Sequence, residues 1–432
     1  MRVLITGAYG LIGAACLARL RLDGHDLIGA GRSIEEARRR VPFVRWIAAD
    51  FRELTTPASW HELLSGIDAV VNCVGALQDG ARDDLRRVHV DAPIALFTTC
   101  ERQGVRRVVH ISAIGAEPAG PTGFARTKGA AESDLKRRDL DWIILRPGLV
   151  LASGVYGGTA MLRGAAGFPG ISPVVAAASP VQIVAIEDVT ETVAWAVRPG
   201  APARLSLDLA HPQVLTIAGI VAGYRGWLGL KAQPTVALPH WCAVATARLA
   251  DALSWLGWRS PLRSTALAQL GTGIVGDPAR WMEATAIAPK SFEDILDRHP
   301  ASVQDRWFAR LYLLKPIAIA VLALFWIATG IIALGPGWSE AVAVMRGAGA
   351  GAGLAGIAVA AGATLDIALG LGVLVRRASR AALSGMLAVS LAYAAAAAVV
   401  APQLFLDPLG PILKVFPIML TNLFALAILD ER

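Results

Sequence analysis

Short apolar runs alternate with polar stretches over the first two thirds of the chain, whereas long apolar segments follow residue 315. The first run, residues 3–5, ends at a threonine and a glycine, which is typical of a short buried strand. The same pattern predicts strands at 26–31, 44–49, 69–74, 107–112 and 142–145, and helices at 14–22, 57–64, 83–103 and 128–138. Strands that alternate with helices form a parallel sheet covered on both faces. We therefore expect an α/β fold built on a doubly wound parallel Rossmann sheet.

Residues 201–300 carry shorter patterns that indicate a small C-terminal subdomain, in which Leu207-Asp208-Leu209 leads into a helix at 216–228, with further short helices at 253–258 and 291–296. We expect a Rossmann domain at 1–200, this substrate-side subdomain at 201–300, a cytoplasmic linker helix at 301–315 and a membrane domain at 316–432. The subdomain holds five tryptophans: Trp227, Trp241, Trp255, Trp258 and Trp281. These tryptophans have two interpretations. They form an apolar surface that contacts a substrate or a membrane, or they fill the core of the subdomain.

Four long apolar segments lie in the last third of the chain, at 316–334, 351–375, 381–401 and 411–429. Their only charged residues are Asp366 and Lys414. A bilayer core needs about 20 apolar residues of helix, so the pattern predicts an all-α, four-helix transmembrane bundle. Small residues at 349, 353, 356 and 360 favour close helix packing in lipid.

Composition agrees with a membrane protein, since 55% of the residues are hydrophobic and 17% are charged. The net charge is +7, and part of that excess flanks the apolar segments. Positive residues precede the first segment and fill the second loop: Arg306, Arg310, Lys315, Arg376, Arg377 and Arg380. The positive-inside rule then predicts that the Rossmann domain and both termini are cytoplasmic, in a multi-pass protein of the inner cell membrane. The first residues are too short an apolar run for a signal peptide.

Three glycines follow the first strand in the order Thr6-Gly7-Ala8-Tyr9-Gly10-Leu11-Ile12-Gly13. Gly7 allows a sharp turn, Gly10 allows close approach of a pyrophosphate, and Gly13 allows the helix to pack near the sheet. The helix N-terminus offers N–H groups to the phosphates. Because the turn lies between a predicted strand and a predicted helix, it predicts a dinucleotide site.

The chain resembles the short-chain dehydrogenase/reductase superfamily, in its extended and atypical branches. The resemblance rests on the glycine turn and on these further motifs: Asp50-Phe51, Asn72-Cys73-Val74-Gly75, His110-Ile111-Ser112-Ala113, Thr127-Lys128 with Glu132, Arg146-Pro147-Gly148, Pro180-Val181-Gln182 and Glu187-Asp188-Val189. It spans about 290 residues, and it is similar to the complex I accessory nucleotide-binding subunit and to NAD-dependent epimerase/dehydratase-like proteins.

This resemblance implies roles for individual residues. Asp50 would accept a hydrogen bond from the adenine amino group, Lys128 would hold the nicotinamide ribose, and Pro147 would border the nicotinamide. The implied cofactor-binding residues are Gly7, Tyr9, Gly10, Leu11, Ile12, Gly13, Arg32, Ser33, Asp50, Phe51, Cys73, Val74, Gly75, Lys128 and Pro147. The implied catalytic residues are Lys128 and Ser112.

Arg32 follows the second predicted strand, where a carboxylate would favour NAD and an arginine accommodates the 2′-phosphate of NADP. NADP(H) is therefore favoured over NAD(H), although a surface arginine stacked on adenine would select neither. The four cysteines and seven histidines are scattered and indicate no metal site. No basic cluster with interleaved aromatic residues indicates nucleic-acid binding.

The family resemblance places a catalytic tyrosine four residues before the lysine, where this chain has Phe124. Phenylalanine cannot donate or accept a proton. The sequence therefore supports cofactor binding better than it supports alcohol or carbonyl redox chemistry. Tyr156 is the nearest tyrosine that could take over this proton transfer, although its position in a loop favours a tyrosine packed on the surface.

The apolar tail resembles the DoxX-like family, which is named after a subunit of a thiosulfate:quinone oxidoreductase. Within it, Asp366 predicts either a proton or quinone site or a structural pair, for example with Lys414. Two functions follow from these features. One is an NADPH-dependent oxidoreductase in the lipid bilayer, with a lipophilic acceptor such as a quinone. The other is a non-catalytic NADPH-binding sensor or assembly factor of a membrane complex.

Overall fold

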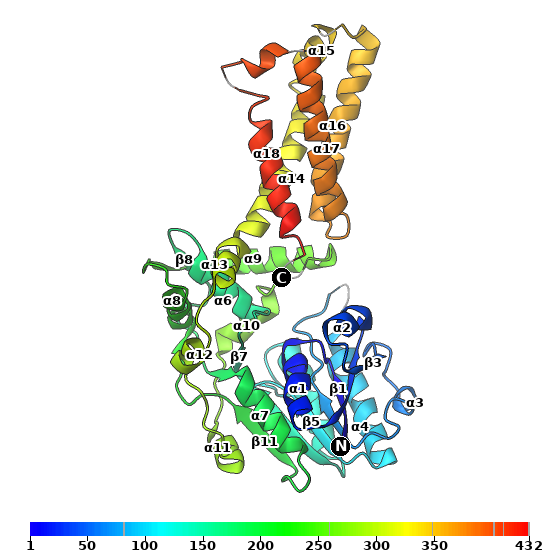
Figure 1. Ribbon diagram of the computed structural model, residues 1–432, viewed down its shortest axis with the longest axis vertical. Coiled ribbons are helices and arrows are strands. Elements are labelled where there is room, and N and C mark those ends of the chain that lie inside the picture. Colours follow the sequence, from blue (N-terminus) through cyan, green and yellow to red (C-terminus); the bar gives the residue numbers. More distant parts are fainter. Residues whose placement is uncertain (81–82, 259, 348, 401, 409, 431–432) are drawn as a thin grey trace. The chain divides into compact units, whose positions relative to one another are not determined.

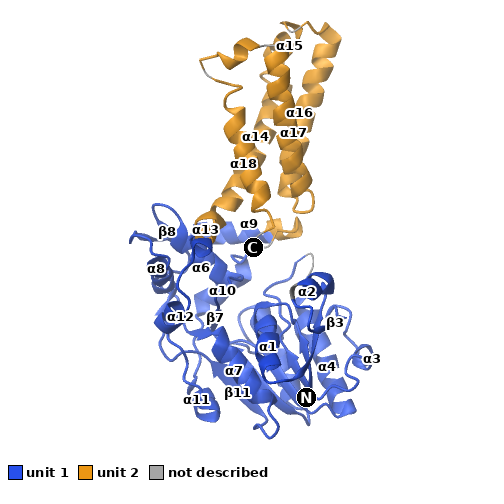
Figure 2. Cartoon of the chain, in the orientation of Figure 1, with its two compact units in different colours: residues 1–251, 260–306 blue, residues 252–259, 307–432 orange. Residues whose placement is uncertain are grey.

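The computed structural model describes residues 1–80, 83–258, 260–347, 349–400, 402–408 and 410–430. These form two compact units, shown in Figure 2, with residues 1–251 and 260–306 in unit 1 and residues 252–259 and 307–432 in unit 2. Each unit has a hydrophobic core of its own.

Unit 1 is built on a seven-stranded parallel sheet in the order β11-β6-β5-β4-β1-β2-β3. Its strands are β1 (Arg2–Thr6), β2 (Asp26–Gly31), β3 (Arg45–Ala48), β4 (Ala69–Asn72), β5 (Arg107–Ile111), β6 (Asp141–Pro147) and β11 (Leu205–Leu209). The predicted Rossmann sheet is confirmed, and each predicted strand of it is present within a few residues of its expected ends.

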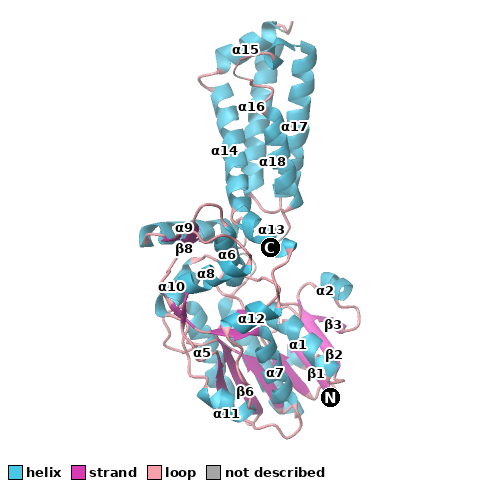
Figure 3. Ribbon diagram, turned by 60° about the vertical axis from the view of Figure 1, so that its left-hand side comes forward, coloured by secondary structure: helices cyan, strands magenta, loops and turns pink. Residues whose placement is uncertain are grey.

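Helices cover both faces of this sheet (Figures 1 and 3). The sequence of β1 shows why, since Val3 and Ile5 enter one core cluster while Leu4 enters the other. The connecting elements are α1 (Leu11–Leu22), α2 (Ile34–Arg40), α3 (Pro57–Trp60), η1 (Arg87–Asp91), α4 (Ala92–Gln103), α5 (Gly123–Lys136) and α7 (Ile186–Val197). The helix predicted at 57–64 is shorter than expected, because α3 ends at Trp60 and turns follow.

The rest of unit 1 consists of short strands and helices within residues 149–185 and 215–298. Its strands pair in three two-stranded sheets: β7 (Leu149–Leu151) with β10 (Ile183–Ala185), β9 (Pro180–Val181) with β12 (Leu215–Thr216), and β8 (Ser172–Val174) with β13 (Thr235–Ala237). Its helices are α6 (Gly158–Gly167), α8 (Ile217–Trp227), α9 (His240–Trp255), α10 (Ser264–Thr272), α11 (Ala279–Thr285) and α12 (Phe292–Arg298). The helix predicted at 253–258 is wrong in its bounds, since α9 starts thirteen residues earlier and ends at Trp255.

Unit 2 is a helical bundle with three helices long and apolar enough to cross a bilayer among the described residues: α14 (Leu314–Leu334), α16 (Ala352–Leu374) and α17 (Ser379–Val400). The short helices α13 (Val303–Tyr312) and α15 (Trp338–Gly347) and the turn η2 (Pro402–Phe405) flank them. Gly330 and Gly370 lie where α14 and α16 touch, since a Cβ at either would come within 3.0 Å of a carbonyl oxygen across the interface. Small residues thus let these helices approach closely.

The fourth predicted span is corrected by the structure. The segment 411–429 forms α18 (Val415–Ala427), whose 13 residues give only about 20 Å of helix. Gly410 takes a left-handed conformation and turns occupy 411–414, so the helix starts late. At the other end of α18, Lys315 donates to the carbonyl oxygen of Leu429 at 2.9 Å, and Arg376 pairs with Asp430 at 2.7 Å. The start of α14, the α16–α17 turn and the end of α18 therefore share one end of the bundle.

Candidate functional site

The carboxyl ends of β1 and β4 meet where the strand order of the sheet reverses. Ligands of open α/β sheets bind at such a switch point. Gly7 leaves β1 with φ +63°, and a Cβ there would lie 2.9 Å from the carbonyl oxygen of Cys73. At Gly13 a Cβ would lie 2.3 Å from the carbonyl oxygen of Gly7. The turn is tight because both positions lack a side chain.

The N-terminus of α1 fits an anionic ligand. Its N-cap is Gly10, which has no side chain to satisfy the N–H groups of the first turn. A pyrophosphate accepts hydrogen bonds from such groups and is favoured by the helix dipole. Leu11 and Ile12 form that first turn, and Ile12 also packs against the core. The glycine turn and the helix start thus match the part of the site that the sequence predicted for phosphates.

Tyr9 and Arg32 form one edge of this region. The Tyr9 ring packs over Gly31, and its hydroxyl accepts a hydrogen bond from the backbone N–H of Arg32 at 3.2 Å. The guanidinium of Arg32 pairs with the Asp83 carboxylate at 2.9 Å. An incoming phosphate would meet both the cation and its carboxylate partner. Ser33 follows as the exposed N-cap of α2.

Asp50 and Phe51 follow β3. The Asp50 carboxylate accepts hydrogen bonds from the Arg52 side chain, which lowers the pKa of Asp50. The Phe51 ring packs edge-to-face on Trp60, with centroids 5.2 Å apart, inside the core. Only the backbone of Phe51 is therefore available to a ligand, which the sequence pattern did not indicate.

The loop after β4 is held by side chains from two other elements. The side-chain carbonyl of Asn72 accepts from the Val74 N–H at 3.3 Å, and Nε2 of His89 accepts from the Ala76 N–H at 2.9 Å. Lys128 donates to the carbonyl oxygens of Val74 and Ile111 at 3.2 and 2.9 Å. The predicted loop residues Cys73, Val74 and Gly75 thus lie beside the predicted lysine.

His89 is a site residue that sequence reasoning missed. It lies in η1, a π-helical turn that runs into α4, and such turns often occur at functional sites. Its Nδ1 contacts the hydroxyl of Thr127 at 2.9 Å, and that hydroxyl donates to the Gly123 carbonyl. Nδ1 is therefore the protonated nitrogen of a neutral ring. Burial lowers the pKa of His89 well below its ordinary value, in agreement with a neutral ring.

Lys128 is buried, and burial lowers its pKa to about 8. Phe124 lies one helical turn before it on α5, with its ring edge-to-face with His89 at 5.6 Å. Ser112 follows Ile111, the carbonyl partner of Lys128. Its buried hydroxyl has no hydrogen-bond partner among the described residues. A buried hydroxyl of this kind fits a site that receives a polar group of a ligand.

Two other residues singled out from the sequence are Pro147, at the carboxyl end of β6, and Tyr156, before α6. Pro147 ends β6 and is buried, and the next residue, Gly148, lies so close to Gln182 that a Cβ would come 2.5 Å from its carbonyl oxygen. Tyr156 is exposed on the loop before α6. The geometry therefore brings the predicted phosphate, ribose and nicotinamide residues to one edge of one sheet.

Two segments of the chain are similar to known protein families. Residues 7–170 match the model of a family described as NAD(P)H-binding. Residues 323–423 match the DoxX-like family. One chain thus combines a Rossmann-fold segment similar to NAD(P)H-binding proteins with a helical segment similar to the DoxX-like family.

Curated relatives match part of the Rossmann domain. Sterol demethylase protein B of Methylococcus capsulatus is 27% identical over 174 residues, which cover 35% of this chain and 52% of the relative. An uncharacterized protein of Mycobacterium tuberculosis is 27% identical over 155 residues, covering 36% of this chain and 16% of that protein. The chain thus spans about half or less of the length of these two relatives.

Solved structures share the fold of unit 1. Bordetella bronchiseptica WbmG in complex with NAD gives a TM-score of 0.52 at 17% identity, covering 69% of this chain and 92% of that one. UDP-N-acetylglucosamine 4-epimerase from Bacillus cereus gives 0.51 at 15% identity, covering 69% and 95%. These neighbours share the Rossmann fold of unit 1, and one of them holds the cofactor NAD.

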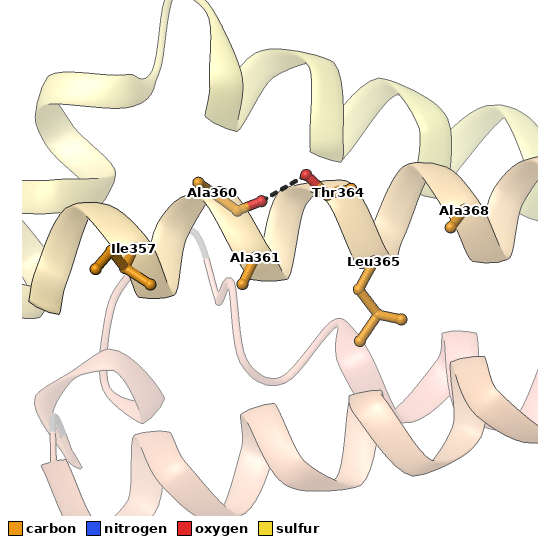
Figure 4. A pocket seen from close by; sticks show the side chains of 6 residues that line it. All are labelled: Ile357, Ala360, Ala361, Thr364, Leu365 and Ala368. Carbon is orange, nitrogen blue, oxygen red and sulfur yellow. Dashed lines mark hydrogen bonds between the residues drawn. The ribbon is translucent and has the colours of Figure 1, made fainter.

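Unit 2 has a groove and a buried carboxylate that bear on ligand binding. Figure 4 shows an open groove along α16 lined by Ile357, Ala360, Ala361, Thr364, Leu365 and Ala368. The Thr364 hydroxyl donates within its own helix to the carbonyl of Ala360 at 2.7 Å. No lining group of this groove is placed to fix a polar ligand. Asp366, in contrast, is buried and accepts a hydrogen bond from the Tyr393 hydroxyl at 3.2 Å, so its partner is not the predicted Lys414.

Proposed function

We propose that this protein is a membrane-anchored, NADPH-dependent oxidoreductase that reduces a lipophilic acceptor such as a quinone. The observation that carries the proposal is the presence in one chain of an NAD(P)H-binding domain and three helices that could cross a bilayer. A hydride donor held beside a membrane has ready access to acceptors dissolved in lipid. The name of the Methylococcus capsulatus relative refers to a sterol, which supports a lipid-soluble substrate.

Each residue of the site would have its own role in binding or catalysis. The N–H groups at the start of α1 would bind the pyrophosphate, and Arg32 would contact the 2′-phosphate that distinguishes NADPH. Lys128 would hold the ribose hydroxyls, and Ser112 would donate to the acceptor oxygen. The bound dihydronicotinamide supplies a hydride, so that NADPH, one proton and a quinone give NADP⁺ and a hydroquinone.

Phe124 favours a quinone over a carbonyl substrate. A quinone takes up the hydride to form a stabilised aromatic anion, so a protein acid is needed less than in reduction of an isolated carbonyl. Lys128, with a pKa of about 8, can release a proton near neutral pH. The lysine ammonium and the serine hydroxyl would thus serve the reaction without a phenol.

The charges of the bundle support a proposed orientation in the membrane. Lys315, Arg376 and Arg380 gather at the end of the bundle that also holds Asp430. The positive-inside rule favours this end on the cytoplasmic side, where NADPH is present. We place the Rossmann domain and both termini in the cytoplasm on this ground, in the inner cell membrane.

A second function, an NADPH-binding sensor or assembly factor of a membrane complex, is favoured by the same Phe124. One experiment separates the two. NADPH oxidation is measured with the protein in lipid nanodiscs, with and without a short-chain quinone, beside Gly10→Asp and Lys128→Ala. Quinone-dependent turnover that both variants lose supports the oxidoreductase. Tight NADPH binding without turnover over a panel of quinones supports the sensor and contradicts our proposal.

A further inference from the structure

Helix α9 has its large apolar side chains on the outside. Trp241, Leu249 and Trp255 are 72%, 60% and 70% exposed. The opposite face is buried and consists of small residues, namely Ala243, Ala247, Ala250 and Ser254. One of these, Ala243, packs in a small cluster with Val175 and Leu262. A helix on a water-exposed surface normally shows the reverse arrangement.

The exposed residues share one face of the helix. Trp241, Ala245, Leu249, Ala252 and Trp255 recur at intervals of three or four residues, and all are exposed. The stripe runs the full length of a 16-residue helix, about 24 Å. Arg248 lies at its border and is also exposed. A continuous stripe of this size, with a tryptophan at each end, marks an interaction surface and not scattered surface residues.

The last turn of α9 belongs to unit 2 (Figure 2). The carbonyl oxygen of Leu256 accepts a hydrogen bond from the N–H of Arg376 at 3.0 Å. The indole of Trp258 donates to the carbonyl oxygen of Leu374 at 2.6 Å. Leu374 ends α16, and Arg376 lies in the turn that leads to α17. The segment directly after α9 is therefore fixed to a turn between two spanning helices, which is the level at which a bilayer surface lies.

A second helix repeats the pattern next to the first span. In α13, Trp307 is 67% exposed, and Val303 and Arg310 lie on the same face and are exposed as well. Only Leu313 separates α13 from α14. Tryptophan beside arginine at the end of a spanning helix is typical of the membrane–water interface.

We propose that the exposed face of α9 is an interfacial anchor that lies flat in the headgroup region of the bilayer, with Trp241, Leu249 and Trp255 turned toward the acyl chains. The occupant of this face is lipid, because the chain at its carboxyl end is tied to the spanning bundle and a tryptophan lies at each end of the face, as at membrane–water interfaces. The inference requires only the membrane and does not depend on the proposed reaction.

The test uses the full chain in nanodiscs that contain a phosphatidylcholine with a diazirine near the start of one acyl chain. After irradiation, lipid adducts are located on tryptic peptides by mass spectrometry. We expect adducts on peptides 232–248 and 249–259, centred on Trp241, Leu249 and Trp255. Peptide 22–32 serves as the control, since its Leu22 is apolar and 82% exposed but lies at the end of α1.

A double variant, Trp241→Glu with Leu249→Glu, should lower the adduct yield on these peptides at least fivefold. Leu22→Glu is the matched control and should leave it unchanged. An unchanged melting temperature of each variant shows that folding is retained. The proposal is overturned if α14 is labelled while peptides 232–248 and 249–259 are not, or if α9 cross-links to a second copy of the chain in place of lipid.

Discussion

The ammonium group of Lys128 donates a hydrogen bond of 2.9 Å to the carbonyl oxygen of Ile111, the last residue of β5. The lysine comes from α5, on another part of the chain, and its second carbonyl partner is Val74. Carbonyl dipoles compensate a buried cation only in part, which is why burial lowers the pKa of Lys128 to about 8. A buried lysine with a lowered pKa is characteristic of a functional site.

The first prediction concerns the pH dependence of cofactor binding. The pKa of Lys128 in the folded protein is about 8, below its ordinary 10.5, so its ammonium loses a proton as the pH rises through 8. If the ammonium contributes about 1.4 kcal/mol to binding, NADPH affinity falls about fivefold from pH 7 to pH 9. Titration of the dissociation constant checks this. Lys128→Met should bind weakly at every pH, and a wild-type profile without a break near 8 contradicts the role.

Replacement of Gly13 by alanine should weaken NADPH binding by about tenfold or more. The added Cβ would lie 2.3 Å from the carbonyl oxygen of Gly7, so the turn has to move. Gly226→Ala is the matched control, because that glycine lies in α8 and nothing is within 4 Å of the added atom. Equal dissociation constants for both variants would show that the turn does not contact the cofactor.

Cofactor preference should depend on the pair formed by Arg32 and Asp83. The carboxylate lies 2.9 Å from the guanidinium and would repel a 2′-phosphate at the same place. Both side chains are partly exposed, so Asp83→Asn should raise NADPH affinity by about 1 kcal/mol, or about fivefold, without changing NADH affinity. Arg32→Asp should reverse the preference. The two cofactors are compared by calorimetry, and a preference that neither variant alters would refute the assignment.

The substitution Phe124→Tyr should introduce a proton donor one turn before Lys128. Reduction of a small aldehyde panel should then rise from the wild-type background by about a hundredfold, the size of a typical general acid effect. Quinone reduction should stay within about twofold, since in our proposal it needs no phenol. Phe124→Leu controls for the loss of the ring contact with His89. A collapse of quinone turnover in Phe124→Tyr alone would count against the proposed use of the site.

Asp366 should act as a structural partner of Tyr393. An asparagine at 366 can still accept the tyrosine hydrogen bond, so Asp366→Asn should keep the melting temperature within about 2 °C. Tyr393→Phe leaves the buried carboxylate without this partner and should be clearly less stable, by about 1–3 kcal/mol. Quinone turnover is measured in parallel. A folded Asp366→Asn protein that has lost turnover would instead assign Asp366 to proton transfer.

The sequence alone determined the strands of the sheet, the glycine turn and the three long apolar helices. These are local features: β1 is a run of apolar residues that ends at Gly7, and α14 is an uninterrupted apolar segment. The periodicity and the length of an apolar run can be recognised within a short window of the sequence. They predict that a segment is buried, whichever other segment of the chain buries it.

The tertiary structure decided which side chains meet. His89 reaches the Ala76 N–H because a π-helical turn redirects it, and Arg32 meets Asp83 across the site. The five tryptophans of residues 201–300 show most clearly what the sequence does not predict. Trp281 is wholly buried, whereas Trp241 and Trp255 are exposed on α9. Their local sequences do not distinguish these cases, because burial of a side chain depends on elements that are distant in sequence and pack against it only in the folded chain.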